Sequence, residues 1–117
     1  MEKTAPCVLR RGERQFAPRF SHGDMAGIAE ITGSGHGTKL GTGFARFQNA
    51  EIPWTVRYDE VLLVLEGHLT VRTETEELKA GPQDCVWLPN GTSLTYLAED
   101  ALVFYAIEPA NWAARMS

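Results

Sequence analysis

The chain has 117 residues and a mass of 12.9 kDa, which predicts one domain over residues 1–117 with a core that needs no disulfides. Its net charge of -4 and pI near 5.3 exclude a basic surface for nucleic acid. No apolar run reaches the length of a membrane span and the first residues lack an apolar signal segment, so we expect a cytoplasmic protein that binds no membrane.

Short apolar, β-branched or aromatic runs recur along the chain between turn-forming residues. Residues 1–20 are expected to form an N-terminal arm with strands, and the tail, residues 109–117, is expected to be helical because it is rich in alanine. Many short strands at close spacing predict an all-β sandwich or barrel. The predicted strands are 7–10, 15–20, 26–32, 42–48, 52–56, 60–66, 68–74, 84–88, 92–97 and 101–108.

The segment VLLVL, residues 61–65, is apolar on both faces of the expected strand. Such a strand is typical of one packed on both sides, here within the fold and under a partner subunit. Two cysteines, Cys7 and Cys85, are too few for a disulfide framework, and we expect each to be a small buried hydrophobic residue. The basic residues Arg10, Arg11, Arg14 and Arg19 are expected on a solvated arm, because Glu13 lies among them and the whole chain is acidic.

A glycine-rich stretch, GSGHGTKLGTG at residues 33–43, invites comparison with phosphate-binding loops. Those loops need Gly-Lys followed by Ser or Thr at the start of a helix, whereas here Gly37-Thr38-Lys39 precedes a predicted strand. We expect a surface loop, with a lid over a pocket mouth as the alternative.

The segments PWTVRYDEVLLVLEGHLTV and AGPQDCVWLPNGTSLTY resemble the two motifs of the cupin superfamily. In the first motif, Glu60 and Gly67 have the expected spacing of six intervening residues. In the second, Gly81, Pro89 and Gly91 match, with a longer gap after Gly81. The resemblance implies a cupin double-stranded β-helix, a jelly-roll barrel, with its core motifs in residues 52–108 and a short C-terminal helical segment.

The positions of the metal-binding histidines of cupins carry other residues in this chain. The His-x-His positions hold Trp54 and Val56, or Pro53 and Thr55 with the longer spacer, and the late histidine position holds Leu94. A single carboxylate cannot hold a divalent transition metal usefully, so we expect no metal and no other cofactor. His36 or His68 supplying a substitute ligand remains the alternative.

Among cupins, the chain most resembles the cupin domain of the EutQ family of ethanolamine utilisation proteins. The resemblance rests on Trp54, YDE at 58–60, LEG at 65–67, LPNGTSL at 88–94 and FYAIEPANW at 104–112. It implies a homodimer, a role in ethanolamine or related amine catabolism, and an acetate-kinase-like activity for which the sequence offers no nucleotide-binding motif.

In the cupin pattern the side chain of Glu60 projects into the barrel, and a buried carboxylate must be hydrogen-bonded, paired or protonated. We expect a hydroxyl of Tyr58 or Tyr96, or a cross-strand group, to satisfy it. The predicted ligand-binding residues are Trp54, Tyr58, Glu60, Trp87, Leu94 and Tyr96. Such a pocket suits a small organic molecule. We expect Glu60 to act in this pocket as a catalytic acid or base. The alternative function is a binding, sensing or accessory assembly module without chemistry of its own. The structural alternative is a filled barrel in which Glu60 belongs to a polar network.

Overall fold

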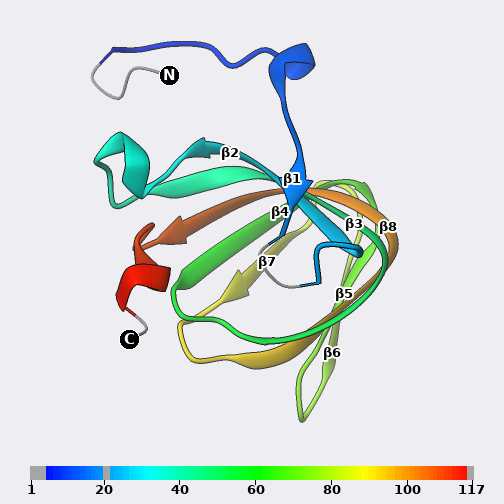
Figure 1. Ribbon diagram of the computed structural model, residues 1–117. Coiled ribbons are helices and arrows are strands. Elements are labelled where there is room, and N and C mark those ends of the chain that lie inside the picture. Colours follow the sequence, from blue (N-terminus) through cyan, green and yellow to red (C-terminus); the bar gives the residue numbers. More distant parts are fainter. Residues whose placement is uncertain (1–4, 20–21, 116–117) are drawn as a thin grey trace.

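The computed structural model describes residues 5–19 and 22–115, which form a barrel of antiparallel strands (Figure 1). Three short 3-10 helices accompany the strands: η1 Arg11–Glu13, η2 Ser34–His36 and η3 Trp112–Arg115. The strands are β1 Ala17–Pro18, β2 Ala26–Thr32, β3 Gly41–Thr55, β4 Asp59–Gly67, β5 Leu69–Arg72, β6 Glu77–Ala80, β7 Cys85–Leu88 and β8 Ser93–Glu108.

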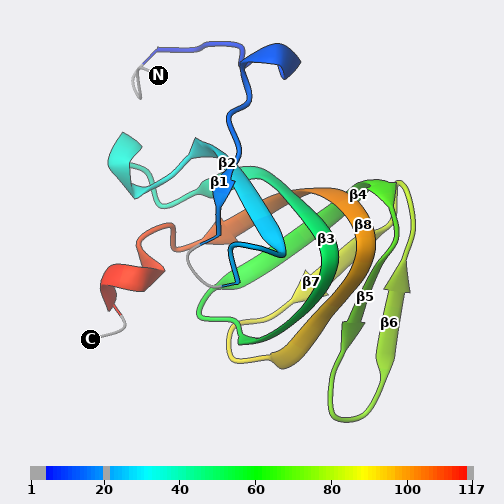
Figure 2. The same ribbon diagram turned by 45° about the vertical axis from the view of Figure 1, so that its right-hand side comes forward.

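Two long strands, β3 and β8, run through both walls of the barrel. They pair antiparallel along nearly their whole length, from Gly41 opposite Ile107 to Thr55 opposite Ser93. The pairing is interrupted at Asn49, whose φ of 47° lies in the left-handed region, and both strands curve there (Figure 2). One half of the pair therefore joins β1, β2, β4 and β7, while the other half joins β5 and β6.

The core lies between these two walls and is built from inward-facing residues of alternating strands. In β4 the burial alternates, so that Leu62 and Val64 are buried while Val61 is 42% exposed. The residues with almost no exposed surface are Ile52, Leu69, Leu88, Val56, Val64, Val71 and Val103. Both walls contribute to this set.

The jelly-roll prediction is confirmed, while several strand predictions are wrong in detail. The predicted strands 42–48 and 52–56 are one strand, β3, and 92–97 and 101–108 are one strand, β8. Residues 7–10 form no strand, and of 15–20 only Ala17–Pro18 pairs, with residue 20 outside the described part. Strand β6 was missed because its sequence, ELKA, has little apolar character of its own.

The expectation that the two cysteines are buried is wrong, because Cys7 and Cys85 are both exposed. Cys85 lies on the outer side of β7, where the alternation turns Val86 and Leu88 inward. The tail is helical as predicted, but it forms a single 3-10 turn, η3, that begins three residues after Pro109. None of the helices in residues 5–19 and 22–115 is long and apolar enough to span a bilayer.

Candidate functional site

A cavity of about 290 Å³ opens at one end of the barrel. Strands β2, β3, β4 and β8 contribute most of its lining, and Pro18 of β1 and Trp112 of η3 complete it. Its polar lining is Arg19, Glu30, Tyr58, Glu60, Tyr96 and Tyr105, and its apolar lining is Pro18, Ile28, Ala45, Phe47, Leu62, Ile107 and Trp112. The cavity thus combines two carboxyl groups, one guanidinium and three phenols within largely apolar walls.

Glu60 lies in this cavity and is 6% exposed, as the inward position on β4 predicts. The hydroxyl of Tyr96, on β8, donates a hydrogen bond of 2.9 Å to Glu60 Oε1, which confirms the expectation of a tyrosine partner. Among the described residues no other hydrogen bond or ion pair reaches the Glu60 carboxyl group. Its second oxygen is therefore available to a molecule in the cavity.

Burial raises the pKa of Glu60 to about 7, because the surrounding apolar walls disfavour the ionised carboxylate. The hydrogen bond from Tyr96 and the positive charge of Arg19 oppose this rise, since both favour the ionised form. The two effects leave Glu60 able to exist in either protonation state near neutral pH, as a general acid or base requires.

Tyr58 and Tyr105 stay neutral phenols over the whole ordinary pH range. Burial, then the nearby Glu60 charge, raises the pKa of Tyr58. Burial, then the charges of Glu30 and Glu60, raises the pKa of Tyr105 to about 12. Tyr58 accepts a hydrogen bond of 3.1 Å from Trp54 Nε1, while its own O–H has no acceptor among the described residues. Tyr105 has no hydrogen-bond partner for its hydroxyl in the same part of the chain.

Arg19 is the cavity residue whose position differs most from the sequence prediction; Glu30, Tyr105 and Trp112 also line the cavity and were not predicted. Arg19 was expected on a solvated arm with Arg10 and Arg11, which are exposed, but Arg19 itself is only 9% exposed and lines the cavity. Its guanidinium carbon lies over the ring of Trp54, 4.9 Å from the centroid. No periodicity marks this position, because it follows the two-residue strand β1 and its burial comes from contacts with distant segments.

The remaining predicted residues lie at different distances from the cavity. Trp54 is half-buried and does not line the cavity itself, but it donates a hydrogen bond to Tyr58 and packs edge-on against Trp112, with 5.6 Å between the ring centroids. Leu94 is 6% exposed within the hydrophobic core and does not line the cavity. Trp87, which we expected in the wall, is 58% exposed on the outer side of β7, because the strand alternation turns its neighbours Val86 and Leu88 inward.

The donor set at the positions of the cupin metal site does not fit a metal ion. Val56 and Leu94 are buried and apolar, and Glu60 supplies one carboxylate. Residues 5–19 and 22–115 contain no group of three or more His, Cys, Asp or Glu side chains that could hold a metal ion. Neither His36 nor His68 lines the cavity. The chemistry of this site therefore has to be derived from its acid, its phenols and its arginine.

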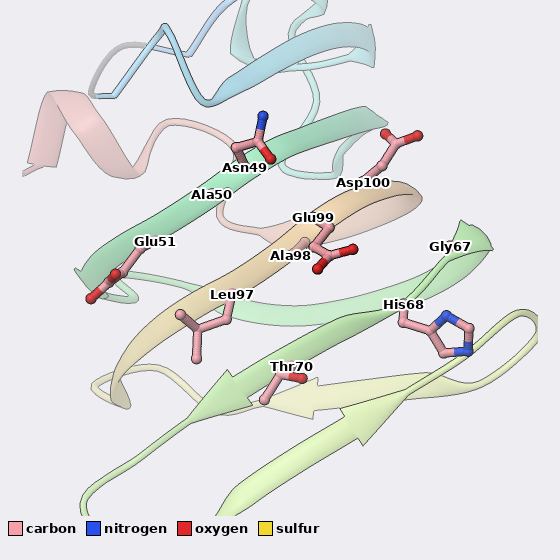
Figure 3. A pocket seen from close by; sticks show the side chains of 10 residues that line it. All are labelled: Asn49, Ala50, Glu51, Gly67, His68, Thr70, Leu97, Ala98, Glu99 and Asp100. Carbon is pink, nitrogen blue, oxygen red and sulfur yellow. The ribbon is translucent and has the colours of Figure 1, made fainter.

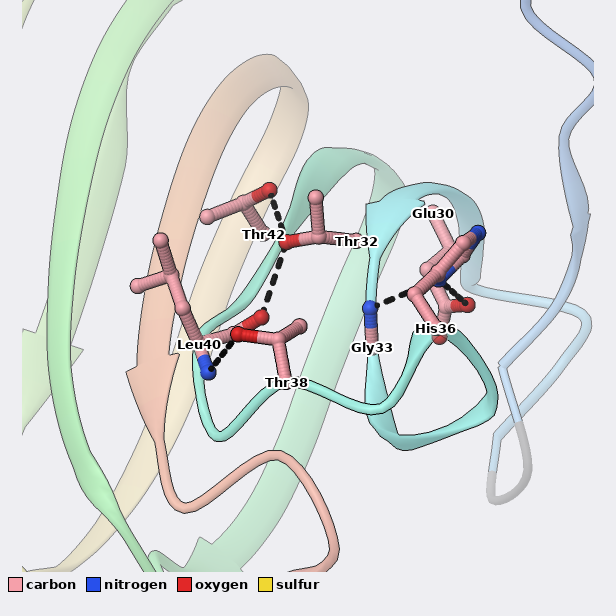
Figure 4. Close-up of polar contacts among 7 residues, drawn as sticks. All are labelled: Glu30, Thr32, Gly33, His36, Thr38, Leu40 and Thr42. Atoms are coloured by element: carbon pink, nitrogen blue, oxygen red, sulfur yellow. Dashed lines mark hydrogen bonds and ion pairs between the residues drawn. The ribbon is translucent and has the colours of Figure 1, made fainter. Parts of the chain in front are cut away.

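The glycine-rich stretch, residues 33–43, is a loop held by its own hydrogen bonds (Figure 4). The backbone N–H of Gly33 donates to His36 Nδ1 at 3.0 Å, and the hydroxyl of Thr32 donates to the carbonyl of Leu40 at 2.8 Å. The chain then enters strand β3 at Gly41 rather than a helix. This arrangement differs from a phosphate-binding loop, as the sequence predicts.

A larger hollow of about 600 Å³ lies on the surface where β3 and β8 curve (Figure 3). Its acidic side chains are not gathered around one point: Glu51 and Asp100 lie at opposite ends of the hollow. Each faces an arginine, Glu51 at 3.9 Å from Arg72 and Asp100 at 3.1 Å from Arg46. The surface ion pairs account for these acids, so the barrel cavity is the better candidate site.

Comparison with known proteins assigns this chain to a family. Residues 21–114 match the family described as ethanolamine utilisation protein EutQ. The chain is 36% identical to Acetate kinase EutQ of Escherichia coli K12 over 87 residues, which are 74% of this chain and 37% of that protein. It is 27% identical to Acetate kinase EutQ of Clostridioides difficile 630 over 78 residues, which are 66% of this chain and 50% of that protein. The chain thus spans half or less of the length of these relatives.

A solved structure supports the same assignment. The crystal structure of an ethanolamine utilization protein Q from Salmonella typhimurium LT2 superimposes with a TM-score of 0.82 at 30% sequence identity, covering 89% of this chain and 86% of that one. At 17% identity, the structure of KdgF from Halomonas has a TM-score of 0.73 and shares the fold. The chain therefore belongs to the EutQ family of ethanolamine utilisation proteins, with a cupin barrel.

Proposed function

We propose that the barrel cavity binds a small metabolite of ethanolamine or related amine catabolism, and that Glu60 transfers a proton to or from it. The single observation that carries this proposal is the buried carboxyl group of Glu60. One of its oxygens is held by Tyr96 and the other is left to the cavity. Buried acids are rare in filled cores, and an oriented acid in a cavity with a free oxygen is typical of a site.

The proposed chemistry needs no metal ion. Tyr96 fixes the orientation of the carboxyl group, and the second oxygen accepts a proton from the bound molecule or returns one. The hydroxyls of Tyr58 and Tyr105 can donate hydrogen bonds to an oxygen on which negative charge develops. The apolar walls formed by Phe47, Leu62 and others exclude water and strengthen these interactions.

The relatives named acetate kinase are much longer than this chain, and their name describes the whole proteins. The glycine-rich loop, the segment most like a phosphate-binding element, enters a strand and is bonded internally. We therefore propose the barrel cavity, rather than this loop, as the place where the metabolite binds.

Replacing Glu60 by Gln tests this proposal. The amide keeps the shape and can still accept the hydrogen bond from Tyr96, but it cannot take up a proton. In a screen of small amines, alcohols and acids, ligands that bind the native state raise the melting temperature of the wild-type protein. For a ligand so found, turnover is followed by NMR of the reaction mixture. We expect the turnover rate of E60Q to be at least ~100-fold lower than that of the wild-type protein.

The matched control is Glu51→Gln, because Glu51 lies on β3 in the surface hollow and its side chain is 70% exposed. E51Q should keep wild-type ligand binding and turnover. A ligand that stabilises the wild-type protein and E60Q equally, with no turnover by either, would leave the barrel a binding or sensing module. A barrel that no small molecule stabilises would contradict the proposal altogether.

We also propose that the protein is a homodimer that buries the outer side of β4 and β7. On that side Trp87 is 58% exposed, Val61 42% and Leu65 37%, and Val61 pairs directly with Trp87. The neighbouring part of the same sheet is covered within the chain, since Arg14 lies 3.6 Å from the centroid of the Phe44 ring. A second copy is the occupant that we propose, because VLLVL is apolar on both sides and only its inner side is covered here.

Sedimentation equilibrium tests the dimer through Trp87→Glu. We expect the wild-type chain to be dimeric at micromolar concentration and W87E to be monomeric, because each copy would bury a charge in an apolar interface. Leu40→Glu is the control: Leu40 is 51% exposed on the loop before β3, a strand that pairs with neither β4 nor β7, and L40E should stay dimeric. A wild-type monomer, or a W87E dimer of unchanged affinity, would refute this interface.

A further inference from the structure

We propose that the cavity selects a small hydroxy acid, whose carboxylate lies against Arg19 and whose hydroxyl donates to the second oxygen of Glu60. This inference rests on the proposal that the cavity binds a metabolite, and it adds the chemical class. It follows from where the donors, the acceptor and the charges of the cavity lie.

The cavity offers several hydrogen-bond donors for one part of the ligand. Arg19 carries a guanidinium with five N–H donors, in a planar arrangement that matches a carboxylate. The O–H groups of Tyr58 and Tyr105 lack acceptors among the described residues. A ligand that satisfies the two phenols must bring acceptor oxygens, as a carboxylate does, and the positive charge of Arg19 in the same lining favours such an anion.

In its ionised form, the second oxygen of Glu60 is the one strong acceptor held inside the cavity by the described side chains. Glu30 also lines the cavity, but its side chain is 57% exposed, so water can satisfy it. A ligand with a hydroxyl or another donor can complete the hydrogen bonding of Glu60, which a simple carboxylic acid cannot. The ligand therefore has to carry both acceptor oxygens and a hydrogen-bond donor.

The charges facing the cavity favour an anion over an ammonium ion. Its titratable or charged groups are Arg19, Glu30, Tyr58, Glu60, Tyr96 and Tyr105. The phenols stay neutral, Arg19 keeps its charge, and Glu60 is partly protonated near pH 7 because burial raises its pKa to about 7. Apart from Glu30, which is exposed to water, the charge held in the cavity is therefore zero or positive, and an ammonium group would meet the like charge of Arg19.

The size of the cavity limits the ligand to a few carbon atoms. A volume of about 290 Å³ is at the lower end of the range for small-molecule sites. Three probes of similar size separate the two requirements, a carboxylate and a hydroxyl. Glycolate has both groups, acetate lacks the hydroxyl, and ethanolamine has the hydroxyl but carries an ammonium group in place of the carboxylate.

Isothermal titration calorimetry at pH 7 and constant ionic strength tests the inference. We expect glycolate to bind the wild-type protein more tightly than acetate by about fivefold or more, and ethanolamine to show no measurable binding. Arg19→Gln should weaken glycolate binding by about tenfold or more, because a charge-assisted bond is lost. In Glu60→Gln the preference for glycolate over acetate should shrink.

Arg14→Gln is the matched control, because Arg14 also lies over an aromatic ring, that of Phe44, but does not line the cavity. R14Q should bind glycolate like the wild-type protein. Arg19→Lys keeps the positive charge and should retain part of the affinity, which separates loss of charge from loss of folding. Circular dichroism of each variant shows whether it is folded.

Two results would overturn the hydroxy-acid inference alone. One is ethanolamine binding as tightly as glycolate, and the other is folded R19Q binding glycolate with wild-type affinity. In either case the proposed function stands if Glu60→Gln changes the affinity for that ligand, because the ligand then still occupies the cavity. If no member of a broad panel of acids, amines and neutral alcohols binds, both the inference and the proposed function fail.

Discussion

Replacing Gly67 by Ala should destabilise the protein by about 3 kcal/mol or more. Gly67 has a φ of +76°, which a residue with a Cβ adopts only at a cost of ~1–2 kcal/mol. A Cβ atom at this position would also collide with the carbonyl group of Asp100, on β8. That group belongs to the backbone of a long central strand, so it cannot move aside as a flexible side chain would.

Gly91→Ala is the control that separates backbone conformation from the collision. Gly91 also has a positive φ, +95°, but a Cβ there would meet nothing within 4 Å. We expect G91A to lose only ~1–2 kcal/mol. Urea unfolding followed by tryptophan fluorescence measures both variants. If G67A and G91A were equally stable, the close approach of β4 and β8 at this turn would be wrong.

The difference in stability between Glu60→Gln and the wild-type protein should depend on pH by about 2–3 kcal/mol between pH 5 and pH 8. The pKa of Glu60 is about 7 in the folded protein and 4.5 in the unfolded chain. Between these values the folded state binds more protons than the unfolded state. The contribution of Glu60 to the free energy of unfolding therefore falls as pH rises from 4.5 to 7, and it stays low above that.

E60Q lacks this titration, so it should gain stability relative to the wild-type protein as pH rises. Urea unfolding of both proteins at several pH values measures the difference, in which the titration of all other groups largely cancels. Tyr96→Phe removes the hydrogen bond that favours the ionised carboxylate, so it should raise the pKa of Glu60 further and extend the dependence to higher pH. A stability difference between E60Q and wild type that does not change with pH would show that Glu60 is not buried.

The family motif identified the inward-facing acid and its fold without any structure. Glu60 and Gly67 are separated by the spacing that the resemblance requires, and alternation on β4 turns Glu60, Leu62 and Val64 inward. The expectation of a tyrosine partner also held, because a buried carboxylate must be satisfied and two tyrosines lay within the motifs. These predictions depend on local spacing, which a sequence carries directly.

The other members of the site could not be predicted so well. Trp87 was expected in the wall, but a strand of four residues gives too little alternation to show which side faces inward. Arg19 was assigned to a solvated arm because nothing around it in the sequence indicates burial. Tyr105 and Trp112 lie in the quoted segment FYAIEPANW but were not predicted to bind a ligand, and they reach the cavity through the pairing of β8 and the packing of η3.

By itself, the sequence determined the all-β class, the turns, the inward position of Glu60 and the loss of the cupin histidines, because each of these depends on residues close together in the chain. Only the tertiary structure decided that β3 and β8 each serve both walls, that Arg19 lines the same cavity as Glu60, and that Tyr96 holds one oxygen of Glu60 and leaves the other to the cavity. Those features come from contacts between residues far apart in sequence, and local patterns carry no record of such contacts.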